Sequence, residues 1–202
     1  MPDEQRPLGI DAELILAIQK GDLDAFEALF NKYKGLIFRT ALAITHDSGT
    51  AEEVLQDCFL KAYTNIERIN PELPISPWLH RVAVNLSCNA LKKHRWLEPL
   101  ENITERLFSD NGASPEGAAE LGELSGMLRQ MIDRLPLKHR VVVVLHYLQE
   151  FSLPEIAYII DCPVGTVKSR LHYARQVLRV GLEKEYGRMV PTVTELGMEV
   201  VL

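Results

Sequence analysis

The apolar residues of this chain recur mainly at steps of three and four, which is the spacing of an amphipathic α-helix. The clearest stripe lies between residues 164 and 179 and consists of Val167, Leu171, Ala174 and Leu178. Similar stripes predict helices over five earlier segments: 11–19, 26–44, 51–66, 78–94 and 121–135. Capping-box spacing at Thr50 and Glu53 marks the expected start of the third of these helices. The pattern therefore predicts an all-α protein.

One segment has an ambiguous pattern. Four consecutive valines, Val141 to Val144, have the composition of a buried β-strand. The apolar positions Leu137, Val141, Val144, Leu145 and Leu148 also fit a helix, and no partner strand is expected elsewhere in the chain. The residues alone leave both possibilities open.

Residues 152–178 predict two short helices joined by a tight turn. Ser152 and Glu155 have the spacing of a capping box, so Ser152 is expected to cap the first helix. Pro163 disfavours helical geometry at Cys162, which places a break between the two helices. A helix-turn-helix is the expected motif.

The outer face of the second helix is cationic and rich in hydrogen-bonding groups, and no acidic residue occurs between Asp161 and Glu183. Such a face suits the major groove of DNA. The alternative is an ordinary solvated surface, which normally mixes both signs of charge. Ser169, His172 and Tyr173 point outward as candidates for base contacts. The full set of candidates is Lys168, Ser169, Arg170, His172, Tyr173 and Arg175, of which Lys168 and Arg175 lie nearest the apolar stripe and are expected to meet phosphates.

Two other faces carry candidate chemistry. On the helix expected at 51–66, Glu53, Gln56 and Asp57 form an acidic and amide patch, which either stabilises the helix dipole or binds a partner. On the helix expected at 78–94, amides and cations share one face beside a proline-rich loop, as in single-stranded DNA-binding proteins, although a solvated surface would look similar. These residues are Arg81, Asn85, Asn89 and Lys92, with Trp96 continuing the line.

Composition and charge narrow the class of protein. The 202 residues are 47% hydrophobic and carry a net charge of −6, which argues against a protein that coats nucleic acid indiscriminately. The longest continuous apolar run, 141–145, is too short to cross a bilayer, and no signal peptide is recognisable, so we expect a cytoplasmic protein. No glycine-rich phosphate loop, nucleophile motif, carboxylate cluster or metal-ligand spacing appears, so we expect neither an enzyme nor a cofactor or metal.

The negative charge is concentrated in the middle of the chain. Residues 97–120 contain one basic and six acidic residues, together with prolines, glycines and serines. This composition predicts a flexible acidic linker between two helical domains, at 11–96 and 121–186, followed by a frayed tail at 187–202.

Several segments resemble the extracytoplasmic-function (ECF) sigma factors, the small members of the sigma-70 family. The run DCPVGTVKSRLHYAR, at 161–175, resembles their C-terminal helix-turn-helix, and LPLKHRVVVVLHYLQEFSLPEIA resembles the segment that leads into it, which favours a helix for the valine run. The segment AEEVLQDCFLKAY resembles the part that grips the clamp coiled coil of the largest polymerase subunit. The segment PWLHRVAVNLSCNALKKHR resembles the part that melts the −10 promoter element.

The resemblance implies a subunit that binds core RNA polymerase and directs it to a subset of promoters. Glu53, Gln56 and Asp57 would contact the clamp of the polymerase, and the family also binds the flap of the polymerase. Asn85 would lie at the mouth of a pocket for an unstacked base of the −10 element. The C-terminal helix would read the −35 element, with Tyr173 at a position that arginine often occupies in the family. An anti-sigma factor is a further expected partner.

A stand-alone helix-turn-helix regulator with a helical sensing domain is the alternative function. Such a protein would bind duplex operators by itself and would form no stable complex with polymerase.

Overall fold

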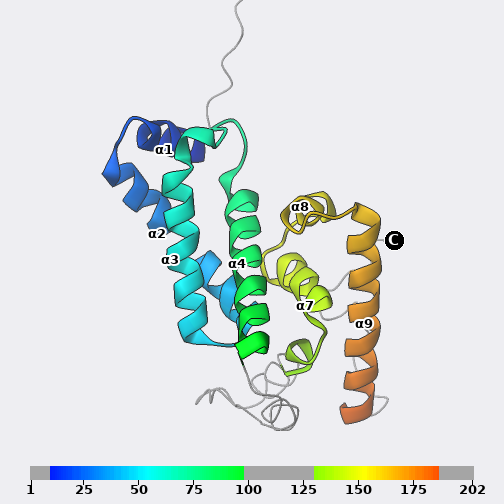
Figure 1. The fold of residues 1–202 in the computed structure, drawn as a ribbon. Helices are drawn as coiled ribbons and strands as arrows, with labels where there is room; N and C mark the ends of the chain where they lie inside the picture. The colour runs from blue at the N-terminus through cyan, green and yellow to red at the C-terminus, as the bar shows by residue number, and fades with distance from the viewer. Residues whose placement is uncertain (1–9, 98–129, 187–202) are drawn as a thin grey trace, which may run out of the picture.

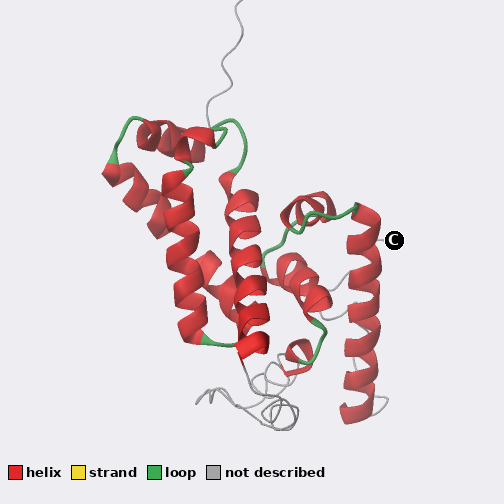
Figure 2. Cartoon of the chain, viewed as in Figure 1, coloured by secondary structure: helices red, strands yellow, loops and turns green. Residues whose placement is uncertain are grey.

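The computed structural model describes residues 10–97 and 130–186, which form two groups of helices packed side by side (Figures 1 and 2). No strand occurs in these two ranges, and the valine run is helical. The all-α prediction is therefore confirmed. Of the helix expected at 121–135, only 130–133 is helical within the described residues. The expected tail at 187–202 and nearly all of the expected linker lie outside them.

The N-terminal group consists of four α-helices and one 3-10 turn. The elements are α1 (Ile10–Gln19), α2 (Leu23–Thr45), α3 (Ser48–Thr64), η1 (Ile66–Arg68) and α4 (Ile75–Leu97). Asp22 caps α2, because its side chain accepts hydrogen bonds from the backbone N–H groups of Asp24 and Ala25. The apolar stripes of these helices meet in one core, in which Leu29, Ile37 and Leu79 have no exposed surface.

Two expected helix starts were wrong. The N-cap of α3 is Asp47 rather than Thr50, since the Asp47 carboxylate accepts a 2.7 Å hydrogen bond from the Thr50 N–H. Helix α4 begins at Ile75, so Pro77 lies in its first turn rather than in a loop. Proline is tolerated there because the first N–H groups of a helix have no partner within it.

The C-terminal group is a second helical unit. Its elements are α7 (Leu137–Val143), the π-helical turn η2 (Val144–Leu148), α8 (Leu153–Ile159) and α9 (Val164–Tyr186). All five residues of the apolar run 141–145 are buried. Five consecutive buried residues leave no polar position within the run, which explains why periodicity could not distinguish this run from a strand.

The helix-turn-helix forms as expected. Ser152 and Glu155 make the predicted capping box at the start of α8. The chain then turns at Asp161, whose φ of +52° is a left-handed conformation, before Pro163 and the start of α9. Val167, Leu171, Ala174 and Leu178 are all buried, so the predicted stripe of α9 faces the core of this unit.

The two groups share part of their packing. Ile44 of α2 and Val84 of α4 belong to the apolar core of the C-terminal group. The His80 ring of α4 lies edge-on against the Phe151 ring, with centroids 4.7 Å apart. Arg140 of α7 donates a hydrogen bond to the Ile44 carbonyl at 3.0 Å. In this arrangement α4 lies directly beside α8 (Figure 1).

Candidate nucleic-acid interface

Helix α9 presents a polar face opposite its buried stripe. Lys168, Ser169 and His172 are all exposed on that face. Lys168 has no hydrogen-bond or ion-pair partner within residues 10–97 and 130–186. Ser169 Oγ donates to the Thr166 carbonyl at 3.0 Å, and His172 Nε2 lies 3.0 Å from Gln176 Nε2. In the part of the chain that the structure describes, this face therefore combines an unpaired cation with polar side chains, which are the groups that contact DNA.

Tyr173 and Arg175 are held by side chains from other elements. The Tyr173 ring lies against the His139 ring of α7, with centroids 4.2 Å apart and an angle of 31° between the planes. Arg175 Nε donates to the Tyr147 hydroxyl at 2.7 Å, and its guanidinium lies 5.8 Å from the centre of that ring. Tyr173 remains 45% exposed, whereas Arg175 is half-buried between α9 and η2.

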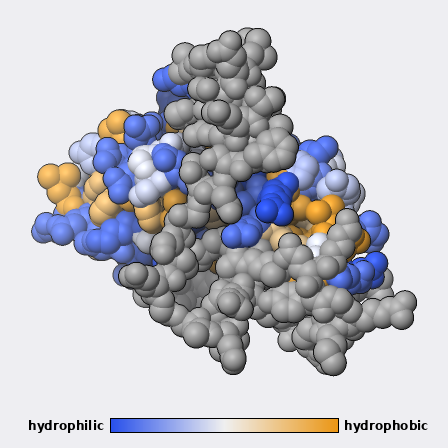
Figure 3. All heavy atoms as spheres, turned by 90° about the horizontal axis from the view of Figure 1, so that it is seen from below, coloured by the Kyte–Doolittle hydropathy of each residue, from blue (hydrophilic) through white to orange (hydrophobic). Residues whose placement is uncertain are grey.

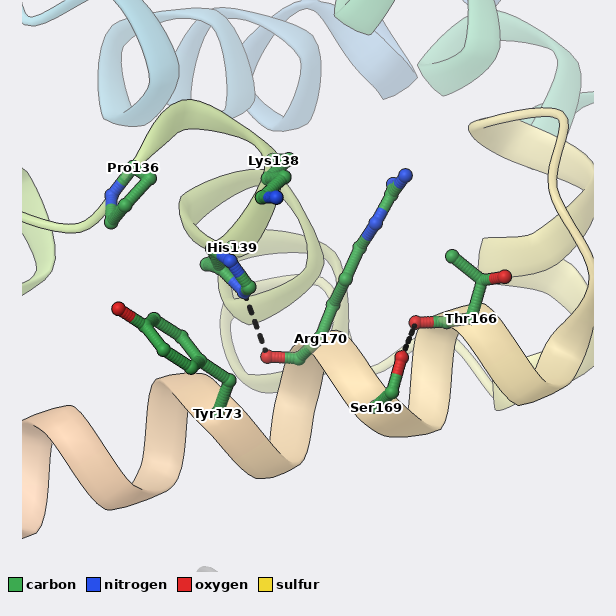
Figure 4. Close-up of a pocket in the computed structure, with 7 residues that line it drawn as sticks. All are labelled: Pro136, Lys138, His139, Thr166, Ser169, Arg170 and Tyr173. Carbon is green, nitrogen blue, oxygen red and sulfur yellow. Dashed lines mark hydrogen bonds between the residues drawn. The ribbon is translucent and has the colours of Figure 1, made fainter.

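An open hollow of about 690 Å³ separates the start of α7 from the first turns of α9 (Figure 4). Lys138 and Arg170 line it together with hydroxyl and aromatic groups, and no acidic side chain is among its lining residues. His139, which also lines the hollow, has its Nδ1 3.2 Å from the Arg170 carbonyl, so this imidazole joins the two helices. The hollow can therefore accept an anion or a polar chain.

On α4, three of the five predicted DNA-binding residues are available and one is occupied. Asn85, Asn89 and Lys92 are exposed. Arg81 instead faces the C-terminal group, where its Nη1 donates to the Tyr158 carbonyl at 2.6 Å and its Nη2 lies 3.4 Å from the Asp161 carboxylate. The side chain of Trp96 lies outside the described part of the structure.

The patch on α3 is exposed along one face. Glu53, Gln56 and Asp57 all reach solvent. Leu60 and Tyr63, one and two turns further on, are 61% and 45% exposed and continue the patch with apolar surface. Apolar surface next to acidic and amide groups is typical of a protein-binding face. On the face of the molecule shown in Figure 3, hydrophilic and hydrophobic residues are mixed among the coloured atoms.

The described residues offer no metal site, and one of their thiols is deeply buried. They contain no cluster of three or more His, Cys, Asp or Glu side chains that could hold a metal ion. Burial raises the pKa of the Cys58 thiol to about 12, so this residue packs as a small apolar group. Within the same ranges, no helix is both long and apolar enough to cross a membrane.

Two family models match the two groups of helices. The model for sigma-70 region 2 matches residues 29–97, and that for sigma-70 region 4 matches residues 125–178. The chain is also 38% identical over 173 residues to the ECF RNA polymerase sigma factor SigW of Bacillus subtilis, a match that covers 82% of this chain and 92% of that protein. The chain belongs to the extracytoplasmic-function sigma factors of the sigma-70 family.

Further relatives agree with this assignment. The sigma factor is 32% identical to the ECF RNA polymerase sigma-E factor of Escherichia coli, with 83% of this chain and 92% of that protein covered. It is 31% identical to the RNA polymerase sigma-H factor of Pseudomonas aeruginosa, with 86% and 94% covered. As a sigma factor, it is a transcription initiation factor that binds core RNA polymerase and directs it to specific promoters.

Two solved structures share the fold. CnrH in complex with the cytosolic domain of CnrY has a TM-score of 0.65 at 20% identity and covers 88% of this chain and 99% of that one. The sigma factor RpoE of Bartonella quintana, in complex with the anti-sigma factor NepR, has a TM-score of 0.63 at 21% identity and covers 81% and 98%.

Sequence reasoning missed two features of the sigma factor's surface. Leu60 and Tyr63 were not recognised beside the α3 patch, although their positions one and two helical turns beyond Gln56 were a usable signal. The contact of His139 with Tyr173 joins residues 34 positions apart on different helices, and no local pattern announces it.

Proposed function

We propose that the sigma factor reads the −35 promoter element as duplex DNA through α9. The observation that supports this most strongly is the outer face of α9, where Lys168 has no partner within the described residues and no acidic residue occurs between Asp161 and Glu183. Lys168 and Arg170 contact phosphates in this proposal, and Ser169, His172 and Tyr173 reach base edges. Arg175 contributes only if it leaves Tyr147.

The N-terminal group has two roles in the proposal. Asn85, Asn89 and Lys92 on α4 hold the melted −10 element, and Trp96 helps to hold it. Arg81 contributes when its contacts with Asp161 and Tyr158 are broken. On α3, the exposed Glu53, Gln56 and Asp57 bind basic residues of the polymerase clamp. The domains accordingly span 11–96 and 121–186, with a linker at 97–120 and a tail at 187–202. The protein acts in the cytoplasm and is not an enzyme.

Reading both elements requires the two groups to separate. The −10 and −35 elements lie about 25 base pairs apart, or about 85 Å at about 3.4 Å per base pair. In the structure Arg81 of α4 touches Asp161, three residues before α9 begins. The proposed linker at 97–120 has 24 residues and spans about 80 Å when fully extended, which is comparable with this separation.

An anti-sigma factor is the expected regulator. The supporting observation is the RpoE structure with the same fold, which was solved with its anti-sigma factor NepR bound. A stand-alone regulator is the less favoured alternative, since both sigma-70 regions are present in one chain.

Binding to core RNA polymerase, followed by transcription from a library of genomic fragments, tests the function directly. We expect a stable complex and transcripts that start downstream of a shared pair of promoter elements. Failure to bind core polymerase, together with tight duplex binding by the free protein, would instead support the regulator.

Lys168→Ala tests the role of α9. We expect the holoenzyme to lose about one phosphate contact. The fall of log affinity with log salt then becomes less steep by about 0.9. Lys20→Ala is the matched control, because Lys20 is an exposed lysine at the end of α1, far from α9 in the chain. If Lys168→Ala behaves like Lys20→Ala, α9 is not the duplex reader.

A further inference from the structure

Helix α7 borders the face that α9 presents to DNA. Lys138 of α7 is exposed and, like Lys168, has no partner within residues 10–97 and 130–186. It lines the hollow of about 690 Å³ together with Thr166, Ser169 and Arg170, which belong to the first two turns of α9 (Figure 4). A duplex that lies along these turns of α9 therefore passes the open side of this hollow.

His139, the next residue of α7, is buried and makes two contacts with α9. Its Nδ1 lies 3.2 Å from the Arg170 carbonyl, which can only accept, so in the neutral ring Nδ1 carries the proton. The same ring lies against the Tyr173 ring at 4.2 Å. Figure 4 shows the hydroxyl end of Tyr173 directed toward Pro136, at the start of α7. His139 thus limits the directions in which the half-exposed Tyr173 can point.

We propose that α7 is a second element of the duplex-binding site, in which Lys138 contacts a DNA phosphate and His139 positions Tyr173. In helix-turn-helix complexes, elements that flank the recognition helix contact the backbone and so fix its orientation in the groove. Lys138 supplies such a contact across the hollow. His139 is a positioning residue, because its ring is buried and acts through Tyr173 rather than on a base. The inference rests on the proposed reading of the −35 element by α9.

The first test measures the affinity of holoenzymes, assembled from the full chain, for an upstream duplex recovered from the fragment library. We expect Lys138→Ala to lower the salt slope by about 0.9, so that its deficit relative to the unmodified protein shrinks by about 3.5-fold between 50 and 200 mM salt. Sequence preference should not change, because a phosphate contact carries no base information. A slope equal to that of Lys20→Ala would overturn the role of Lys138.

The second test separates positioning from mere stabilisation. We expect His139→Ala and Tyr173→Ala to change preference at the same base pairs, and the double variant to be no worse than Tyr173→Ala alone. His139→Phe should restore most of the preference, since it retains an aromatic ring against Tyr173. His139 does not position Tyr173 if His139→Ala lowers the midpoint of unfolding but leaves base preference intact. The same conclusion follows if the effects of His139→Ala and Tyr173→Ala on duplex binding add in the double variant.

The outcomes also distinguish this inference from the proposed function. If Lys168→Ala weakens duplex binding and Lys138→Ala does not, α9 reads DNA without α7. If neither change affects binding, the assignment of the −35 element to this face fails.

Discussion

The burial of His80 predicts that the contact between the two groups of helices weakens in acid. Its ring is 1% exposed and lies between α4 and Phe151 of the C-terminal group. Nδ1 donates to the Ser76 carbonyl at 2.8 Å, whereas Nε2 has no hydrogen-bond partner of good geometry within residues 10–97 and 130–186. Burial lowers the pKa of His80, opposed by the hydrogen bond to Ser76 and by the Gln149 side chain. A proton on Nε2 would place a charge in a buried site, where the loss of hydration outweighs the support of Ser76 and Gln149.

The size of the effect follows from linkage. Because the pKa of His80 is lower in the folded protein than in the unfolded chain, the unfolded chain binds the proton first as the pH falls. The contribution of the neutral ring to stability is therefore complete above about pH 6.5 and declines below it, until the pH passes the folded pKa. If the buried ring stays neutral, the free energy of unfolding falls by about 1.4 kcal/mol between pH 7.5 and pH 5.5.

Chemical denaturation at these two pH values, followed by tryptophan fluorescence, measures this difference. Trp78 lies two residues from His80 on α4 and reports on this region. His80→Leu should reduce the difference between the two pH values by about 1.4 kcal/mol. His172→Leu, which changes an exposed histidine, should leave it unaltered. His46 also has a pKa lowered by burial and by Arg140, so some pH dependence should remain in the His80 variant. If His80→Leu retains the full difference, His80 is not held neutral at the interface.

Three further changes test single elements. Asn85→Ala should slow promoter melting, measured by permanganate reactivity of the −10 element, and leave core binding intact; loss of core binding would make Asn85 structural. Asp57→Ala should compete less well than the unmodified protein for core polymerase without a change in its circular dichroism spectrum, since Asp57 is exposed. If the variant competes equally well, Asp57 does not belong to the polymerase interface. Ser152→Ala removes the α8 cap and should cost about 1 kcal/mol in chemical denaturation; no measurable loss would show that solvent satisfies the helix end equally well.

The start of a helix could be predicted from the sequence where a single capping signal was present. The capping box at Ser152 and Glu155 was predicted correctly, because both partners belong to the same helical turn. At α3 the spacing of Thr50 and Glu53 suggested the wrong cap. Asp47, three residues earlier, offers a carboxylate that satisfies the first N–H groups at least as well. Start signals of this kind compete, and the sequence does not rank them.

The candidate site was predictable only in part, for a similar reason. Helical periodicity placed Lys168, Ser169 and His172 on one exposed face of α9, as the structure has them. Periodicity says nothing about what other elements do to a face. Arg81 and Arg175 lie on helices of the expected type, yet each is bound by a group from another element, Asp161 in one case and Tyr147 in the other.

The helices, their buried stripes and the cationic surface of α9 could be read from the amino-acid sequence, because hydrophobic spacing and charge act over one or two turns of chain. The way in which the two groups meet could not be read from local patterns. Arg140 reaches the Ile44 carbonyl across 96 residues, and Arg81 reaches Tyr158 across 77. Such contacts depend on the packing of whole helices against one another, since each requires two surfaces to be brought together before either side chain has a partner.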